Sequence, residues 1–195
     1  MARLTLAFTL ILIIISSFLL WSEKNAPAPV AAEGKPAIGG PFSLTNQDGK
    51  TVTDKDFRGK ILLVYFGFTH CPDQCPLTLA NFTQVMNALG SKAGQVAPLF
   101  ISVDPAHDTP KRMKEFLAAF SPAITGLTGT NAQVADVAVA YKVYYAAHDT
   151  KHASESAVDH SGFIYVMDRE GNYLTHFSAD TTPKQIETSL RPYLQ

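Results

Sequence analysis

The sequence is poor in cysteine and in concentrated charge. Its only cysteines, Cys71 and Cys75, lie far from the N-terminus, so no lipoprotein-type lipid attachment is expected there. The 16 basic and 17 acidic residues are scattered along the chain and give a formal net charge of −1. The chain has no basic stripe, so nucleic acid is not expected as a partner, and it has no acidic run typical of a disordered tail.

Charge is completely absent from one N-terminal stretch. Residues 4–22 (LTLAFTLILIIISSFLLWS) would span about 28 Å as a helix, close to the hydrocarbon thickness of a bilayer. A buried core helix is not favoured because the stretch has no polar face, and Trp21 suits a membrane interface. A cleaved signal sequence is the alternative, but its best small-residue site, at residues 30–32, lies well beyond the apolar run. The sequence therefore predicts a transmembrane anchor.

The surroundings of this stretch predict its orientation. Arg3 favours a cytoplasmic N-terminus, so the remaining chain is expected on the far side of the membrane. The stretch lacks an arginine- and serine-rich presequence, which favours a bacterial inner membrane with the domain facing the periplasm. Residues 23–36 are rich in alanine and proline and are expected to form a linker. The globular domain is then expected over residues 37–195.

Within this domain, strand and helix patterns alternate. Asp48-Gly49 predicts a hairpin turn, and the apolar runs 61–68 and 96–104 predict two strands buried on both faces. Further strands are expected at 142–147, 162–168 and 172–178. Helices are expected at 76–90, 109–120, 131–141 and 182–194, with Thr109 and Thr182 as the N-caps of two of them. This order predicts an α/β fold, a three-layer sandwich around a mixed central sheet.

The two cysteines follow the first buried strand directly and precede its helix. At such junctions, ligands and reactive groups gather in α/β sheets. Because proline follows each cysteine, neither Cys71 nor Cys75 is expected in mid-helix, and the helix is expected to begin at Pro76. The positive end of that helix should favour thiolate over thiol. A thiolate serves equally well as a redox nucleophile and as a metal ligand, so the cysteines alone do not distinguish these two functions.

His160 tilts this choice toward a metal. It lies between Asp159 and the predicted strand 162–168, and two thiolates with one imidazole suit a soft ion such as Cu(I). Structural zinc normally has a fourth protein ligand. No proline lies between Pro122 and Pro183, although thioredoxin-like oxidoreductases generally carry a cis-proline before the strand that faces their cysteines. A purely structural disulfide would stabilise weakly because it closes a loop of only five residues.

Four segments occur in order across residues 37–194: GFTHCPDQCP, ISVDPAHDTP, YKVYY and VDHSGFIYVMDREG. Together they resemble the signature blocks of the SCO/SenC family of copper proteins. The resemblance implies a thioredoxin-like fold behind one transmembrane helix, and copper, as Cu(I) or Cu(II), bound by Cys71, Cys75 and His160. It also implies delivery of copper to the dinuclear copper centre of cytochrome c oxidase. His107 departs from the arginine usual in the family and is interpreted as a surface change.

Two functions stay open. A copper chaperone, an assembly factor rather than an enzyme, is favoured. Its partners would be the copper-bearing subunit of cytochrome c oxidase and a periplasmic thiol reductase or other copper carrier. The alternative is a thiol-disulfide oxidoreductase in which Cys71 and Cys75 reduce the cysteines of that subunit. A thiol peroxidase is least favoured because no arginine is evident near the cysteine loop.

Overall fold

Strand β3 (Ile61–Gly67) is buried along its whole length and sends its side chains alternately to the two faces of the sheet. Ile61, Leu63 and Tyr65 belong to one apolar cluster. Leu62, Val64 and Phe66 belong to the other. A strand covered on both faces needs an apolar residue at every position, which is why this segment is a continuous apolar run. The buried strand predicted here is confirmed.

The computed structural model describes residues 38–145 and 162–195. These residues belong to one compact unit, Pro36–Gln195. The predicted anchor at 4–22 and linker at 23–36 lie outside the described residues and stay predictions. Within the two described ranges, no helix is both long and apolar enough to cross a bilayer.

The described strands form one mixed sheet of seven strands in the order β2-β1-β5-β4-β3-β6-β7. At its centre, β3, β4 (Val96–Ser102) and β5 (Thr125–Thr128) run parallel. The strand β6 (Phe163–Met167) pairs antiparallel with β3, and β7 (Tyr173–Ser178) completes that side. The predicted hairpin is formed by β1 (Ser43–Asn46) and β2 (Thr51–Thr53) on the opposite side.

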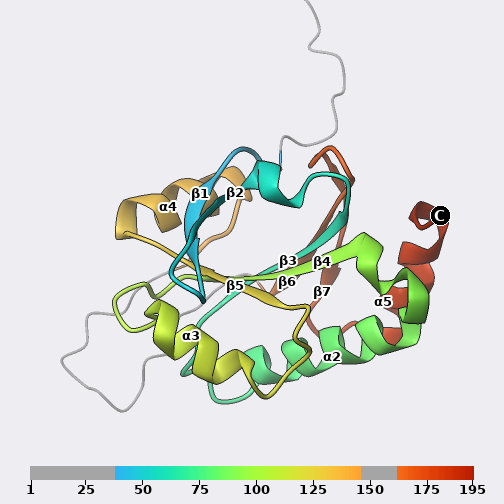
Figure 1. The fold of residues 1–195 in the computed structure, drawn as a ribbon, viewed down its shortest axis with the longest axis horizontal. Helices are drawn as coiled ribbons and strands as arrows, with labels where there is room; N and C mark the ends of the chain where they lie inside the picture. Colours follow the sequence, from blue (N-terminus) through green and yellow to red (C-terminus); the bar gives the residue numbers. More distant parts are fainter. Residues whose placement is uncertain (1–37, 146–161) are drawn as a thin grey trace, which may run out of the picture. The chain divides into compact units, whose positions relative to one another are not determined.

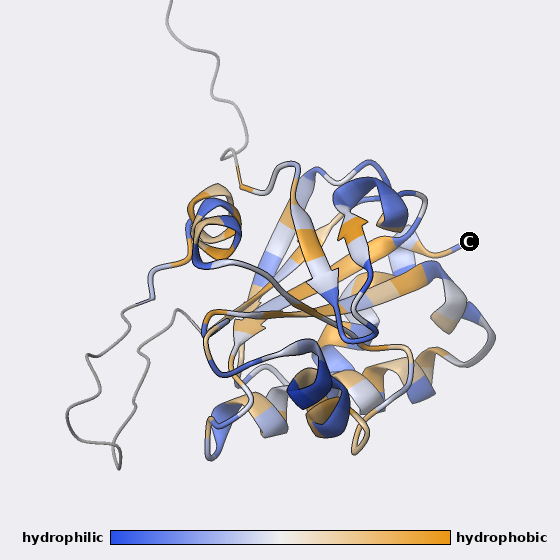
Figure 2. Cartoon of the chain, turned by 60° about the vertical axis from the view of Figure 1, so that its left-hand side comes forward, coloured by the Kyte–Doolittle hydropathy of each residue, from blue (hydrophilic) through white to orange (hydrophobic). Residues whose placement is uncertain are grey.

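Helices cover both faces of the sheet. On one face lie α2 (Gln74–Leu89), α3 (Pro110–Leu117) and α5 (Pro183–Leu190), and on the other lies α4 (Asn131–Ala140) (Figure 1). Short 3-10 helices lie at η1 (Asp54–Phe57), η2 (Gly90–Gln95) and η3 (Arg191–Tyr193). Hydrophobic residues concentrate along the central strands (Figure 2). The predicted three layers and mixed sheet are confirmed, and they are consistent with the thioredoxin-like fold that the resemblance implies.

Threonine and proline set the start of two helices. The side chains of Thr109 and Thr182 each accept a hydrogen bond from the backbone N–H three residues later. Each is followed by a proline, Pro110 or Pro183, which lacks an N–H and has the dihedral angle that a first helical residue needs. The threonine caps predicted at these two positions are therefore confirmed.

The strand predicted at 142–147 is wrong over residues 142–145. There, α4 ends in a Schellman motif: Lys142 has φ 57°, Lys142 N–H donates to Val139 O, and Val143 N–H donates to Ala138 O. The chain therefore turns away where an extended segment was expected. Residues 146 and 147 lie outside the described residues.

The short strand β5 was not predicted from the sequence. Its residues, TGLT, lack the apolar run of the other central strands. The packing of α3 against β5 explains why position 126 is a glycine. A Cβ at this position would lie 2.5 Å from Leu117 Cδ1 and 2.8 Å from Met113 Cε, so glycine allows α3 to pack closely on β5.

Candidate metal centre

The cysteines lie at the carboxyl end of β3, a central strand between β4 and β6. The chain leaves β3 after Gly67 and enters α2 at Gln74, and Cys71 lies in the connecting loop. This is the strand-to-helix junction predicted from the sequence. The neighbouring strand β4 ends at the same edge, because Gly67 pairs with Ser102 in the parallel register.

The helix α2 begins at Gln74, two residues before the predicted start at Pro76. Cys75 therefore lies in the first helical turn, which agrees with the prediction that it is not in mid-helix. The first N–H groups of a helix have no acceptor within it, so Pro76 is tolerated there. The helical hydrogen bonds begin at Leu77, whose N–H donates to Asp73 O.

The two cysteines are free thiols that lie side by side. The backbone N–H of Cys75 donates to Cys71 Sγ, with an N···S distance of 3.4 Å. Their exposure differs, because Cys71 is half-buried whereas Cys75 is fully buried. A metal ion or a partner that arrives from solvent therefore reaches Cys71 first.

Two residues of β3 shape the space around Cys75. Gly67 provides room, since a Cβ at this position would lie 2.6 Å from Cys75 Sγ and 2.8 Å from Phe100 Cε2. The hydroxyl of Tyr65, itself fully buried, lies 3.7 Å from Cys75 Sγ. This contact is not predictable from the sequence, because Tyr65 lies in a continuous apolar run that predicts only a buried strand. Tyr65 thus places a hydroxyl group beside the buried thiol.

Burial decides the ionisation of Cys75. It raises the pKa of this thiol to about 12, although a hydrogen bond with the Phe68 backbone acts in the opposite direction. The expectation that the helix start favours thiolate is therefore wrong for Cys75. The thiol carries its proton at neutral pH in the metal-free protein, and a metal that binds the sulfur must displace that proton.

An imidazole pair lies beside the cysteine loop. Asp104 Oδ2 is 2.8 Å from His107 Nδ1 and 3.6 Å from His70 Nε2. The two imidazole rings are 5.7 Å apart. His107 is exposed, so its interpretation as a surface residue agrees with the structure. The sequence did not indicate that this surface adjoins His70, the residue before Cys71.

An arginine does lie near the cysteine loop, contrary to the expectation from the sequence. Arg112 Nε, in the first turn of α3, donates to Thr69 Oγ1 at 3.2 Å. Thr69 precedes Cys71 by two residues in the sequence. The contact joins residues 43 positions apart, which explains why the sequence did not reveal it. The absence of arginine is thus no argument against peroxidase chemistry.

His160 and Asp159 lie outside the described residues, so the predicted third ligand stays a prediction. The described strand β6 begins at Phe163, and Ile164 lies opposite Tyr65. The start of β6 is therefore at the edge of the sheet from which the cysteine loop leaves. Within residues 38–145 and 162–195, no group of three His, Cys, Asp or Glu side chains is arranged to hold a metal.

Residues 30–195 match the family model described as SCO1/SenC. The human "Protein SCO1 homolog, mitochondrial" is 42% identical to the chain over 166 residues, which are 82% of this chain and 55% of the human protein. The chain thus spans about half the length of this relative.

The fold is also found in solved structures of similar proteins. The copper-bound structure of Bradyrhizobium japonicum ScoI is 46% identical, with a TM-score of 0.75 over 81% of this chain and 100% of that chain. A second, BsSco, is 26% identical, with a TM-score of 0.63 over 79% of this chain and 91% of that chain. It is described as having a disulfide switch and as a member of the Sco family of cytochrome c oxidase assembly proteins. Together with the match over residues 30–195, these likenesses confirm the predicted resemblance: the chain belongs to the SCO1/SenC family.

Proposed function

We propose that the chain is a copper chaperone that binds one copper ion through Cys71, Cys75 and His160. It delivers this ion to the dinuclear copper centre of cytochrome c oxidase during assembly. The observation that carries the proposal is the pair of adjacent free thiols at the carboxyl end of β3. Thiolates suit soft metals, among them Cu(I), zinc and the iron of iron–sulfur clusters, and the likeness to copper-bound ScoI favours copper among these.

The unequal burial of the thiols gives binding an order. Copper first meets the half-buried Cys71, and Cys75 then joins from inside as its proton leaves to solvent. His160 supplies the third donor. Release begins at the same exposed sulfur: a thiolate or imidazole of the acceptor displaces Cys71 first, because that sulfur is reached from solvent. Three donors permit such exchange more readily than a closed cage of four.

The proposed location and partners follow from the N-terminal sequence and from the likeness to BsSco. Residues 4–22 anchor the chain in a bacterial inner membrane, and the domain faces the periplasm. The acceptor is the copper-bearing subunit of cytochrome c oxidase, supported by the description of BsSco as a member of a family of oxidase assembly proteins. Because the periplasm is oxidising, a thiol reductase keeps the two cysteines able to bind copper.

Replacement of each proposed ligand tests the copper site. Cys71→Ser and Cys75→Ser should abolish stoichiometric Cu(I) binding, and His160→Ala should weaken it, as measured by competition with a chromogenic chelator under anaerobic conditions. His152→Ala is the matched control, since it removes a histidine eight positions earlier in the sequence that has no proposed role. An unchanged affinity in His160→Ala would remove this residue from the site.

The difference in thiol exposure also favours a second function, a thiol-disulfide oxidoreductase. The Cys71 thiolate would attack a disulfide of the oxidase subunit, forming a mixed disulfide and releasing one partner thiolate. Cys75 would then attack Cys71 Sγ, releasing the second thiolate and leaving Cys71 and Cys75 oxidised. The disulfide switch described for BsSco supports this chemistry.

The ionisation of Cys75 ranks this function second. Because burial raises the pKa of Cys75, this thiol is mostly protonated at neutral pH, so the resolving step is slow. A Cys75→Ser variant should accumulate the mixed disulfide if the reaction occurs. Absence of both the mixed disulfide and the Cys71–Cys75 disulfide would exclude the oxidoreductase.

A further inference from the structure

Asp108 is a fully buried carboxylate to which the proposed function assigns no role. Its Oδ1 accepts a hydrogen bond from Thr69 Oγ1 at 2.6 Å. Its Oδ2 accepts from Ser102 Oγ at 2.6 Å and from the Thr69 backbone N–H at 3.1 Å. A buried carboxylate is costly unless such donors surround it, so these contacts explain how Asp108 is tolerated inside the protein.

The bonds of Asp108 differ from those of ordinary loop-capping residues in this chain. The side chains of Asn46 and Asp168 accept hydrogen bonds from residues two to four positions further along their own turns. Asp108 instead bonds to Thr69, 39 positions away. The Asp108–Thr69 contact holds two separate loops together, whereas the bonds of Asn46 and Asp168 stabilise single turns.

Asp108 fixes the entry of the cysteine loop. Thr69 precedes Cys71 by two residues, and Ser102 is the last residue of β4. Arg112 adds a further hydrogen bond to Thr69 Oγ1 from the first turn of α3. The segment leading to Cys71 is thus tied to the end of β4 and to the start of α3.

We infer that Asp108 is a positioning residue for copper binding: it acts through Thr69 to hold Cys71 beside Cys75. The inference rests on the proposed function. Cys75 belongs to α2, whereas Cys71 lies in a loop, so the placement of one sulfur relative to the other depends on how that loop is held. A loop held before the metal arrives loses less conformational entropy on binding. Residues behind metal ligands commonly contribute to affinity in this way.

Variants at both ends of the Asp108–Thr69 contact test the inference. Asp108→Asn and Thr69→Val should each lower Cu(I) affinity by about 10- to 100-fold, as is typical of residues that orient ligands. Thr69→Ser keeps the hydroxyl and should retain the affinity of the wild-type protein. In the Cu(II)-loaded protein, the cysteine-to-copper charge-transfer bands should shift in Asp108→Asn and Thr69→Val but not in Thr69→Ser.

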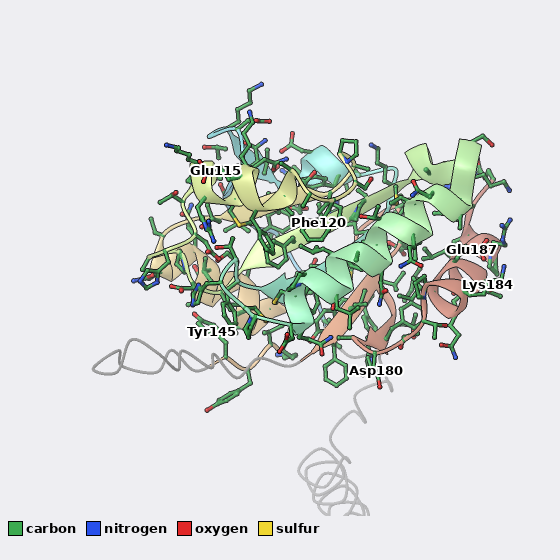
Figure 3. The ribbon with its side chains drawn as sticks, turned by 90° about the horizontal axis from the view of Figure 1, so that it is seen from below. Glu115, Phe120, Tyr145, Asp180, Lys184 and Glu187 are labelled. Carbon is green, nitrogen blue, oxygen red and sulfur yellow. The ribbon has the colours of Figure 1, made fainter. Side chains whose placement is uncertain are left out.

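Glu187→Gln is the matched control for a buried carboxylate. Glu187 is buried in α5 and forms ion pairs with Lys184 and Arg191. Helices α5 and α3 cover the same face of the sheet but lie at opposite ends of it (Figures 1 and 3). This variant should lose thermal stability but keep both copper affinity and the charge-transfer bands. If Glu187→Gln lowers the copper affinity and shifts the charge-transfer bands as much as Asp108→Asn does, a general loss of stability explains both variants. The positioning role of Asp108 is then excluded.

The remaining outcomes are also decisive. Wild-type affinity and bands in Asp108→Asn would overturn the inference. If Asp108→Asn does not fold, equal affinities in Thr69→Val and Thr69→Ser would overturn it. If the wild-type protein binds no copper, the proposed function fails, and alkylation of the Cys71 thiol by a maleimide tests Asp108 separately. An alkylation rate unchanged in Asp108→Asn, relative to wild type and Glu187→Gln, would then overturn the positioning role.

Discussion

At the scale of single residues, Tyr65 and Cys75 form a buried pair whose hydroxyl oxygen and sulfur lie 3.7 Å apart. Burial is the main reason that the pKa of Tyr65 is raised, so its hydroxyl keeps its proton and can donate a hydrogen bond. If copper binds Cys75 as proposed, the sulfur becomes a thiolate and the Tyr65 hydroxyl donates to a charged acceptor. Such bonds are stronger than those between neutral groups.

The first prediction concerns this hydroxyl. Tyr65→Phe keeps the ring that stacks against Phe100 but removes the donor 3.7 Å from Cys75 Sγ. Because this bond is long, Cu(I) affinity should fall several-fold, equivalent to about 1 kcal/mol. Competition titration measures the change, with the more exposed Tyr193→Phe as control. Equal affinities in the two variants would show that the hydroxyl has no part in binding.

A second prediction follows from the raised pKa of Cys75. In the metal-free folded protein this pKa is about 12, whereas an unperturbed thiol has a pKa of 9.0. The folded state thus holds the proton more tightly, so its stabilising effect is complete below about pH 9 and is lost as pH rises toward 12.

Urea unfolding of the reduced protein checks the sign. From pH 8 to pH 10, the free energy of unfolding of the wild-type protein should fall by about 1 kcal/mol relative to Cys75→Ala. The variant controls for lysine and tyrosine groups that titrate in the same range. A difference between the two proteins that stays constant with pH would contradict the raised pKa.

At the scale of elements, the β3–loop–α2 unit requires close approach of its strand and helix. Gly67 is the position where this requirement is most severe, since any side chain there would meet Cys75 Sγ and Phe100. Because Phe100 belongs to β4, the same glycine also sets how closely the neighbouring strand packs. The packing of this unit therefore limits which residue can end β3.

The third prediction is the effect of filling this space. Gly67→Ala should destabilise the protein by about 1–3 kcal/mol, as overpacking of a core does, and should displace Cys75 enough to weaken Cu(I) binding. Thermal unfolding and competition titration measure the two effects. Gly94→Ala is the control, because a Cβ at this exposed position meets no atom within 4 Å. A Gly67→Ala protein with unchanged stability and affinity would show that the packing adapts freely.

The elements also show what the sequence could predict. Continuous apolar runs revealed β3 and β4, and threonine-proline pairs revealed the starts of α3 and α5. The strand β5 was missed because Gly126 serves packing against α3 rather than strand propensity. The cysteine pair was predicted from local spacing, and its place after β3 is confirmed. Asp108 and Arg112 were missed because their contacts with Thr69 join residues about 40 positions apart.

At the scale of the whole molecule, the distribution of apolar residues predicts two different environments. The core of the described domain is made of short apolar segments that alternate with polar turns, whereas residues 4–22 form one uninterrupted apolar stretch. The former suits burial within a folded domain and the latter suits a bilayer.

The fourth prediction concerns this division. In a bacterial host, the full chain should remain in the membrane fraction after carbonate extraction, and protease added to spheroplasts should digest residues 37–195. A shortened chain in the soluble periplasmic fraction would instead indicate a cleaved signal sequence. A full chain protected from protease would contradict the proposed orientation.

The separate supports of the two sulfurs have a mechanical consequence. Cys75 moves with α2, whereas the segment before Cys71 is held by β4 and α3. Under the proposed function, copper bound to both sulfurs would link α2 to the segment held by β4 and α3. The copper-loaded protein should then resist local opening at this edge of the sheet better than the metal-free protein does.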